Sequence, residues 1–176
     1  MKLPKAPGRT TPGFAFSILR RALTECLGAR QFGQAEMAQV LAFFGLTEPA
    51  CVFCGSPEVK RWDHLVAVTQ DGETVLGNMV PACACCDDSK RHVPFEEWML
   101  CDAQGSPTSR GVEDVAGRVA RIQAYVQQFG YRVRPLEERL DEGERERLAR
   151  IQADLQRLRS EVDSLIADYR ARTEHH

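Results

Sequence analysis

The chain has little excess charge of either sign and no long apolar run. Its 23 lysines and arginines nearly balance its 25 aspartates and glutamates, which leaves a formal net charge of -2 over 176 residues. Any affinity for nucleic acid must therefore come from local basic clusters and not from bulk charge. No apolar run is long enough to span a bilayer, and the first residues lack the apolar core of a signal peptide. We expect a cytoplasmic protein with no membrane contact.

The seven cysteines are clustered along the chain. Four of them form two CxxC pairs, which are Cys51, Cys54, Cys83 and Cys86. The thiolates of a CxxC pair converge on one side of a tight turn, so two pairs predict a tetrahedral structural Zn²⁺ site. Clustering does not fit a disulfide framework and favours a reducing cytosol. Cys85 could compete with Cys86 as a ligand, although only Cys86 has the CxxC spacing from Cys83. Cys26 and Cys101 are expected to be small buried thiols.

Polar residues between and after the two CxxC pairs add chemistry that a structural zinc ribbon does not need. The chain reads CVFC from Cys51, WDHLV from Trp62, and NMVPACACCDDSK from Asn78 to Lys90. Over this central third the chain resembles the HNH (ββα-metal) nuclease family, whose pattern has Asp-His between two CxxC pairs and a polar residue directly after the second. Asp87 stands at that last position, where His or Asn is more usual, and its hard oxygen favours Mg²⁺ or Mn²⁺.

The resemblance implies a metal-dependent endonuclease with a defined set of site residues. His64 would be the general base, since a neutral imidazole can take a proton from water near neutral pH. Asn78 would hydrogen-bond a bent backbone and fix that imidazole. Asp63 and Asp87 would hold catalytic Mg²⁺ or Mn²⁺ together with the scissile phosphate and waters. The expected DNA phosphate-binding residues are Lys90, Arg91 and Arg61, of which Arg61 is equally well read as a solvated surface charge.

Two of these roles raise a geometric question. Asp63 and His64 are neighbours on an expected strand, and neighbours on a strand point to opposite faces. A local irregularity or the twist of the hairpin must therefore bring both side chains to one site. Asp87 is expected to open a helix, where it would also serve as N-cap.

The expected fold class is α+β and mostly helical, with a central ββα-metal (HNH) module stapled by the four-cysteine zinc site. Strands over 60–69 and 73–80 should form a hairpin around Asp71-Gly72, and a short helix should begin at Pro94 and end near Cys101. The expected divisions are a flexible arm at 1–12, an N-terminal helical region at 13–47, the zinc-stapled module at 48–101, a loop and packing helix at 102–135, and a long C-terminal helix at 136–176.

The N-terminal region carries two amphipathic helical patterns and a basic cluster. Apolar residues recur at helical spacing from Phe14 to about Ala29 and again from Met37 to Phe44, where Gly45 should end the second helix. The pair could be a helix-turn-helix reader, although packing around a small core is the commoner role. The basic residues of this region are Lys2, Lys5, Arg9, Arg20, Arg21 and Arg30, and a second basic cluster is Lys90-Arg91-His92.

The C-terminal segment has a heptad pattern. Apolar residues alternate three and four positions apart, at Leu148, Ile151, Leu155, Leu158, Val162, Leu165 and Tyr169. This stripe is narrower than the apolar face of a helix docked on its own domain, so self-association into a homodimer is favoured over docking. In a parallel pair Asp154 would face Arg159 of the second copy.

These patterns favour an endonuclease that acts on double-stranded DNA. A dimer with two active sites suits a site-specific, type II restriction-type enzyme that cuts both strands. Alternatives within the class are a phage-type or homing nicking enzyme, an endonuclease that recognises modified bases, and a general scavenging nuclease or toxin. The alternative of another class is a non-catalytic zinc-ribbon DNA-binding protein, which would need the cysteines but not Asp63, His64 and Asp87.

Overall fold

The computed structural model describes residues 12–173, and the chain divides into two compact units. One unit comprises residues 24–135, and the other combines the residues up to Leu23 with those from Leu136 onward. This grouping cuts across the consecutive division expected from the sequence, because contacts between distant segments leave no trace in local periodicity. Each unit is described by itself.

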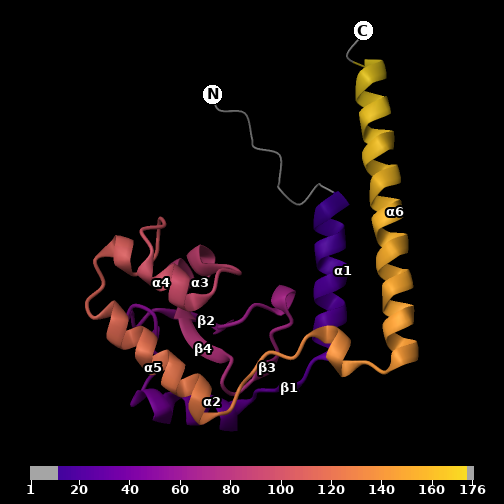
Figure 1. Ribbon diagram of the computed structural model, residues 1–176. Helices are drawn as coiled ribbons and strands as arrows, with labels where there is room; N and C mark the ends of the chain where they lie inside the picture. Colours follow the sequence, from indigo (N-terminus) through magenta and orange to yellow (C-terminus); the bar gives the residue numbers. More distant parts are fainter. Residues whose placement is uncertain (1–11, 174–176) are drawn as a thin grey trace. The chain divides into compact units, whose positions relative to one another are not determined.

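The 24–135 unit is built on a two-stranded antiparallel sheet (Figure 1). Strand β2 (Val59–His64) pairs with β4 (Met79–Cys83), and every residue of β4 is buried. The register places Asp63 opposite Val80 and His64 opposite Met79. The irregularity in this pairing lies between Val59 and Arg61, so the strand is regular where Asp63 and His64 occur.

The antiparallel pairing of the two expected strands is confirmed in β2 and β4, but the tight turn expected at Asp71-Gly72 is wrong. Residues 65–78 instead form a long connection that contains a 3-10 turn, η1 (Val68–Gln70), and a short strand, β3 (Thr74–Val75). Strand β3 pairs in parallel with β1 (Arg30–Gln31), which the sequence did not predict. Gly72 donates its N–H to the Ala67 carbonyl at 3.0 Å, and a Cβ at this position would collide with the Val66 carbonyl. The glycine therefore closes this loop on itself and does not turn one strand into the next.

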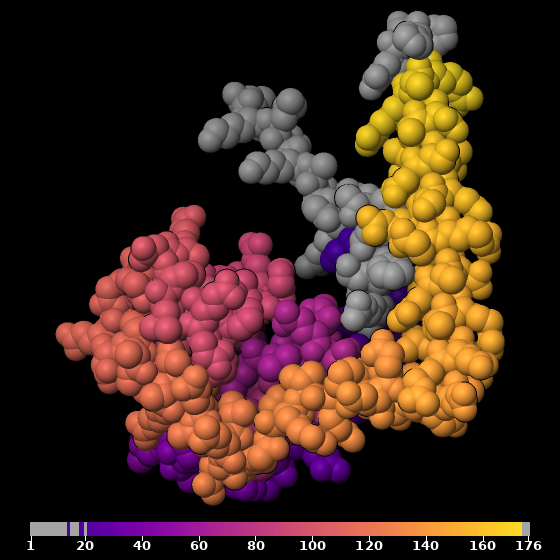
Figure 2. Space-filling model, in the orientation of Figure 1, coloured from indigo at the N-terminus to yellow at the C-terminus, as the bar shows by residue number. Residues whose placement is uncertain are grey.

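Three helices follow the sheet. Helix α3 (Ala84–Lys90) begins directly after Cys83, so the expectation that Asp87 opens and caps it is wrong, and Asp87 lies in its first turn. Helix α4 (Phe95–Leu100) follows Pro94 as expected. Helix α5 (Val115–Gln128) buries Val119, Ile122 and Tyr125 on one face and packs against α4. The two segments lie next to each other on the surface that Figure 2 shows.

The helix α2 (Gln34–Phe44) adds the aromatic part of the core. Gly45 ends it in a left-handed conformation, with φ 64°, as the sequence predicted. The Tyr125 ring packs 5.3 Å from Phe44 and 5.2 Å from Phe129. Its hydroxyl accepts the Gly77 N–H and donates to the Met79 carbonyl, both at 2.9 Å. Helix α5 thus fixes the end of the long connection where it enters β4.

Helix α1 (Pro12–Leu27) precedes this unit and enters it at its last turn. Thr24 is buried there, whereas Cys26, two residues farther round the helix, is exposed, so the expectation of a buried thiol is wrong. Cys101, at the end of α4, is half-buried. Pro12 apart, the expected arm lies outside the described residues, as do the basic residues Lys2, Lys5 and Arg9 and the side chain of Arg20.

The other unit contains a helix that spans 32 residues, α6 (Glu142–Thr173), preceded by the 3-10 turn η3 (Leu136–Arg139). Leu148 at its start is buried, but Leu158, Leu165 and Tyr169 are more than half exposed. The heptad stripe is therefore covered at its start and becomes more exposed toward the end of α6 in the single chain. None of the helices within residues 12–173 combines the length and the apolar character needed to cross a membrane.

Candidate metal centre and the polar cluster beside it

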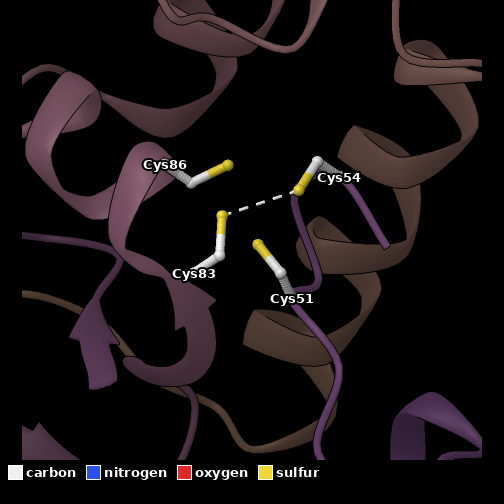
Figure 3. A group of neighbouring side chains, drawn as sticks. All are labelled: Cys51, Cys54, Cys83 and Cys86. Carbon is white, nitrogen blue, oxygen red and sulfur yellow. Dashed lines mark hydrogen bonds between the residues drawn. The ribbon is translucent and has the colours of Figure 1, made fainter. Parts of the chain in front are cut away.

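The four cysteines of the two CxxC pairs converge in space (Figure 3). Their sulfur atoms all lie within 4.8 Å of one another, and the Sγ atoms of Cys54 and Cys83 are 3.7 Å apart. A tetrahedral zinc ion with Zn–S bonds of about 2.3 Å holds its sulfurs about 3.8 Å apart. The four side chains are therefore a site that could hold a metal such as zinc. Cys86 belongs to the group, whereas Cys85 is exposed.

The four thiols also affect one another's protonation. The hydrogen bond with Cys54 and burial raise the pKa of Cys51 to about 12. Hydrogen bonds with Cys51 and Cys86 lower the pKa of Cys54, whereas hydrogen bonds with Cys51 and Cys54, together with burial, raise the pKa of Cys86. One ionised sulfur thus opposes the ionisation of its neighbours. A divalent ion removes that opposition, because thiolates bind it and their protons leave.

The backbone around Cys51 and Cys54 explains why the first CxxC pair turns so tightly. Gly55 adopts φ 80° and donates its N–H to the Cys51 carbonyl at 2.7 Å. Val52 donates to the Pro81 carbonyl at 3.1 Å, which ties this turn to β4 and therefore to the second pair. Phe53 packs edge to face on Trp98 of α4, with ring centroids 5.3 Å apart.

Arg110 is a member of this neighbourhood that the sequence did not reveal. It lies in the 3-10 turn η2 (Thr108–Arg110), and its guanidinium donates to Cys86 Sγ at 2.9 Å and to Cys85 Sγ at 3.4 Å. Partial burial acts to lower the pKa of Arg110, but the charge and hydrogen bonding of Cys86 outweigh it and raise that pKa. The segment looked like a Gly- and Ser-rich loop in the sequence, and only the fold brings it to the sulfurs.

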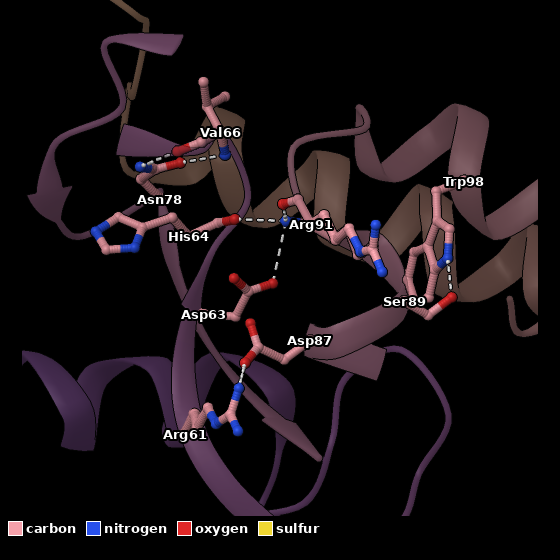
Figure 4. Close-up of polar contacts among 10 residues, drawn as sticks. Arg61, Asp63, His64, Val66, Asn78, Asp87, Ser89, Arg91 and Trp98 are labelled. Atoms are coloured by element: carbon pink, nitrogen blue, oxygen red, sulfur yellow. Dashed lines mark hydrogen bonds and ion pairs between the residues drawn. The ribbon is translucent and has the colours of Figure 1, made fainter. Parts of the chain in front are cut away.

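Asp63 and Asp87 lie near each other, with the Asp63 carboxylate turned to the Lys90 ammonium and the Asp87 carboxylate to Arg61 (Figure 4). Asp63 is 9 % exposed, and its Oδ2 lies 3.1 Å from the Lys90 ammonium. The pKa of Asp63 is raised to about 6, chiefly by burial; Lys90 opposes this rise and the nearby Asp87 adds to it. Two carboxylates from different elements are thus brought together in a partly dry environment, which is a suitable ligand pair for a hard divalent cation.

The three expected phosphate-binding residues lie in different surroundings. Lys90 is fully buried, with its ammonium 2.7 Å from the His64 carbonyl, so it does not present its charge to a phosphate in solvent as expected. It lies four residues after Cys86 on one helix and therefore shares the buried face. Arg61, half exposed, pairs with Asp87 and with Asp88, the latter at 3.0 Å. Arg91 is exposed and donates through Nε to the Asp88 carbonyl at 3.2 Å.

His64 and Asn78 lie on the far side of β2 from the two carboxylates (Figure 4). The His64 Nε2 is 3.0 Å from the Thr74 hydroxyl, so the regular strand does not bring the imidazole and Asp63 to one face. The Asn78 Oδ1 accepts the Val66 N–H at 2.8 Å, and its Nδ2 donates to the carbonyls of Glu73 at 2.7 Å and Val66 at 3.2 Å. Asn78 thereby fixes the chain just beyond His64.

None of the protein-family models, curated proteins or solved structures compared with this chain matches it. The chemistry of the site is therefore interpreted from its own residues.

Proposed function

We propose that the chain is a metal-dependent DNA endonuclease of the HNH type, held together by zinc. The observation that carries the proposal is the proximity of Asp63, on β2, to Asp87, in the first turn of α3, where Asp87 directly follows Cys86 of the four convergent cysteines. The cysteines account for a structural metal, so the carboxylates form a second and chemically distinct site. Their oxygens suit Mg²⁺ or Mn²⁺, which would polarise the scissile phosphate and stabilise the departing oxygen.

The chain's own residues would then position water and phosphate around that ion. By the resemblance, His64 would accept the proton of the attacking water; its ring lies on the far side of β2 from the carboxylates, so it would have to leave Thr74 and move to reach that water. When Nε2 carries the proton donated to Thr74, Nδ1 is the basic nitrogen of the ring. Asn78 would hold the backbone after His64 in place through its bonds to Val66. Arg91 is exposed at the end of α3, and Arg61 would pass from Asp87 to a phosphate once a cation takes its place.

A second candidate is a zinc-stapled DNA-binding protein without catalysis. The observation that favours it is that the carboxylates already have cationic partners, Lys90 on Asp63 and Arg61 on Asp87, while the His64 ring faces Thr74. In that case the acidic pair would be a structural ion-pair network and would need no added metal.

Supercoiled plasmid separates the two candidates. The zinc-loaded protein should convert it to nicked or linear DNA with Mg²⁺, stop when EDTA is added, and resume when Mg²⁺ is restored. The variant Asp87→Asn should bind DNA but cut far more slowly, whereas Asp102→Asn, an exposed carboxylate in the loop after α4, should cut normally. Retarded DNA mobility with no Mg²⁺-dependent cutting would support the non-catalytic candidate instead.

The finer role we propose is a dimeric, site-specific enzyme of the type II restriction kind. The exposed heptad stripe of α6 supports it, because pairing of two stripes would bring two active sites to one duplex. Digestion of a long unmodified DNA followed by sequencing of the ends tests this role. Discrete double-strand ends are expected, whereas nicks in one strand, cutting of modified DNA only, or a smear would indicate the nicking, modified-base or general nuclease alternatives.

A further inference from the structure

We propose that Arg110 is a functional part of the metal centre, where it stabilises the metal-bound thiolate of Cys86. The guanidinium reaches Cys86 Sγ at 2.9 Å through one Nη and Cys85 Sγ at 3.4 Å through the other. A zinc ion with four thiolates carries a formal charge of about -2, and a guanidinium on one sulfur offsets part of it. The inference concerns the cysteine centre alone and does not depend on nuclease activity.

The loop that carries Arg110 is tied down by hydrogen bonds that fix where the side chain lies. Ser106 is fully buried; its hydroxyl donates to the Cys101 carbonyl at 2.6 Å and accepts the Ser109 N–H at 3.1 Å. The Thr108 hydroxyl donates to the Met99 carbonyl at 2.7 Å, which anchors the same loop to α4. The Arg110 Nε points back to the Ser106 carbonyl at 3.4 Å. These contacts leave both Nη groups directed at the sulfurs.

Other arginines near the cysteines have different partners, which makes the Arg110 contact specific. Arg118 extends over Gly55 of the first CxxC turn, but its Nε donates to the Glu113 carbonyl at 3.2 Å. Arg121 donates to the Phe44 carbonyl at 2.7 Å. Arg110 directs two donors to sulfur, and one of those sulfurs belongs to the group that could hold the metal.

The chemical consequence is a less labile centre. A charge-assisted hydrogen bond draws electron density from the thiolate, so the sulfur is a poorer target for protons and electrophiles. Cys86 also directly precedes Asp87 on α3, so Arg110 holds the helix at the point where the acidic pair begins. Loss of the guanidinium should therefore weaken metal retention without removing any ligand.

Competition for zinc tests the inference on the full chain. The variant Arg110→Gln should show roughly 10-fold to 100-fold weaker zinc affinity against a chromogenic chelator, the usual effect of removing a hydrogen bond to a metal ligand. Arg110→Lys keeps the positive charge but loses the forked guanidinium, so its zinc affinity should lie between that of Arg110→Gln and that of the unmodified protein. Arg118→Gln is the matched control and should retain zinc like the unmodified protein.

Cobalt substitution adds a readout that a merely structural role would not move. The sulfur-to-cobalt charge-transfer band should shift to longer wavelength in Arg110→Gln, because a thiolate without the hydrogen bond gives up its electrons more easily. Unchanged zinc affinity together with an unshifted band would overturn the inference. If Arg110→Gln fails to fold, the same two measurements on Arg110→Lys decide: an unshifted band and unchanged affinity in that variant would also overturn it.

Discussion

The two polar clusters of the 24–135 unit differ in how completely the chain itself satisfies them. The four cysteines converge on a common point, and their thiols oppose one another's ionisation until a cation is present. The two carboxylates, by contrast, already have Lys90 and Arg61 as partners. The first cluster could hold a metal such as zinc, whereas in the second a bound metal would have to replace cationic side chains of the protein. The geometry of the cysteine cluster therefore supports a metal by itself. A metal at the carboxylates is supported only by the proposed nuclease function.

The largest effect is expected at the cysteine cluster. Replacing Cys54 with Ser removes one of four ligands, and the 24–135 unit should lose its cooperative unfolding transition, since a structural zinc contributes about 10 kcal/mol or more to folding. Thermal unfolding and zinc content by elemental analysis measure this. The matched control is Cys85→Ser, an exposed thiol in the same segment, which should keep about one zinc per chain and a normal transition. A stable, zinc-free wild-type protein would contradict the assignment.

The next effect concerns the proposed catalytic role of His64. Replacing His64 with Ala should leave folding and DNA binding intact and slow plasmid cutting by roughly 10²–10⁴-fold, the usual contribution of a general base. Rates are measured with Mg²⁺ on the purified, zinc-loaded variant. The exposed His92, replaced with Ala, is the control and should cut normally. Similar rates for both variants would remove His64 from the mechanism.

The sequence predicted those parts of the clusters that depend on residues close together in the chain. The CxxC spacing is local, so it fixed the metal-binding group, including the choice of Cys86 over Cys85. The start of α4 and the end of α2 were predicted from Pro94 and Gly45, which act on their own backbone. Arg110 could not be found, because its contacts with sulfur join residues far apart in the chain.

Other differences concern which face of a helix or strand a side chain occupies, and which strands pair. Lys90 was expected to meet phosphate, yet its spacing from the buried Cys86 already placed it on the inner face of α3, a signal that helical periodicity could have given. The two strands pair antiparallel as expected, but Asp71-Gly72 is not a two-residue turn: it lies in a long connection whose strand β3 pairs with β1. The side chains of His64 and Asp63 point to opposite faces of the sheet, because β2 is regular there and irregular only between Val59 and Arg61.

A smaller effect is expected in how the free energy of unfolding depends on pH, because of Asp63. The pKa of Asp63 is raised from 3.8 to about 6 in the folded protein, so the folded state binds more protons than the unfolded state between these values. Without Mg²⁺, the free energy of unfolding should therefore fall as pH rises through this window, by at most about 3 kcal/mol. Urea unfolding of zinc-loaded wild type and Asp63→Asn across this range isolates the contribution. Parallel curves for the two proteins would mean that Asp63 ionises normally.

The smallest effect on the 24–135 unit should come from α6, which lies in the other unit. Replacing Leu155 and Leu158 with Glu places charges in the heptad stripe, so the proposed dimer should become a monomer, and plasmid products should shift from linear to nicked. Light scattering after size exclusion measures the mass. The control replaces Gln156 and Ser160, which lie outside the stripe, with Glu and should remain dimeric. A monomeric wild type would contradict self-association.

Binding of Mn²⁺ to the zinc-loaded protein tests most directly whether the carboxylate cluster is a second metal site. Electron paramagnetic resonance should show that about one Mn²⁺ per chain leaves the free aqueous signal, and that Mg²⁺ displaces it. In Asp63→Asn and Asp87→Asn this binding should be lost while the zinc content stays unchanged. Mn²⁺ that remains free beside the wild-type protein, or binds equally well to both variants, would contradict the proposed second metal site.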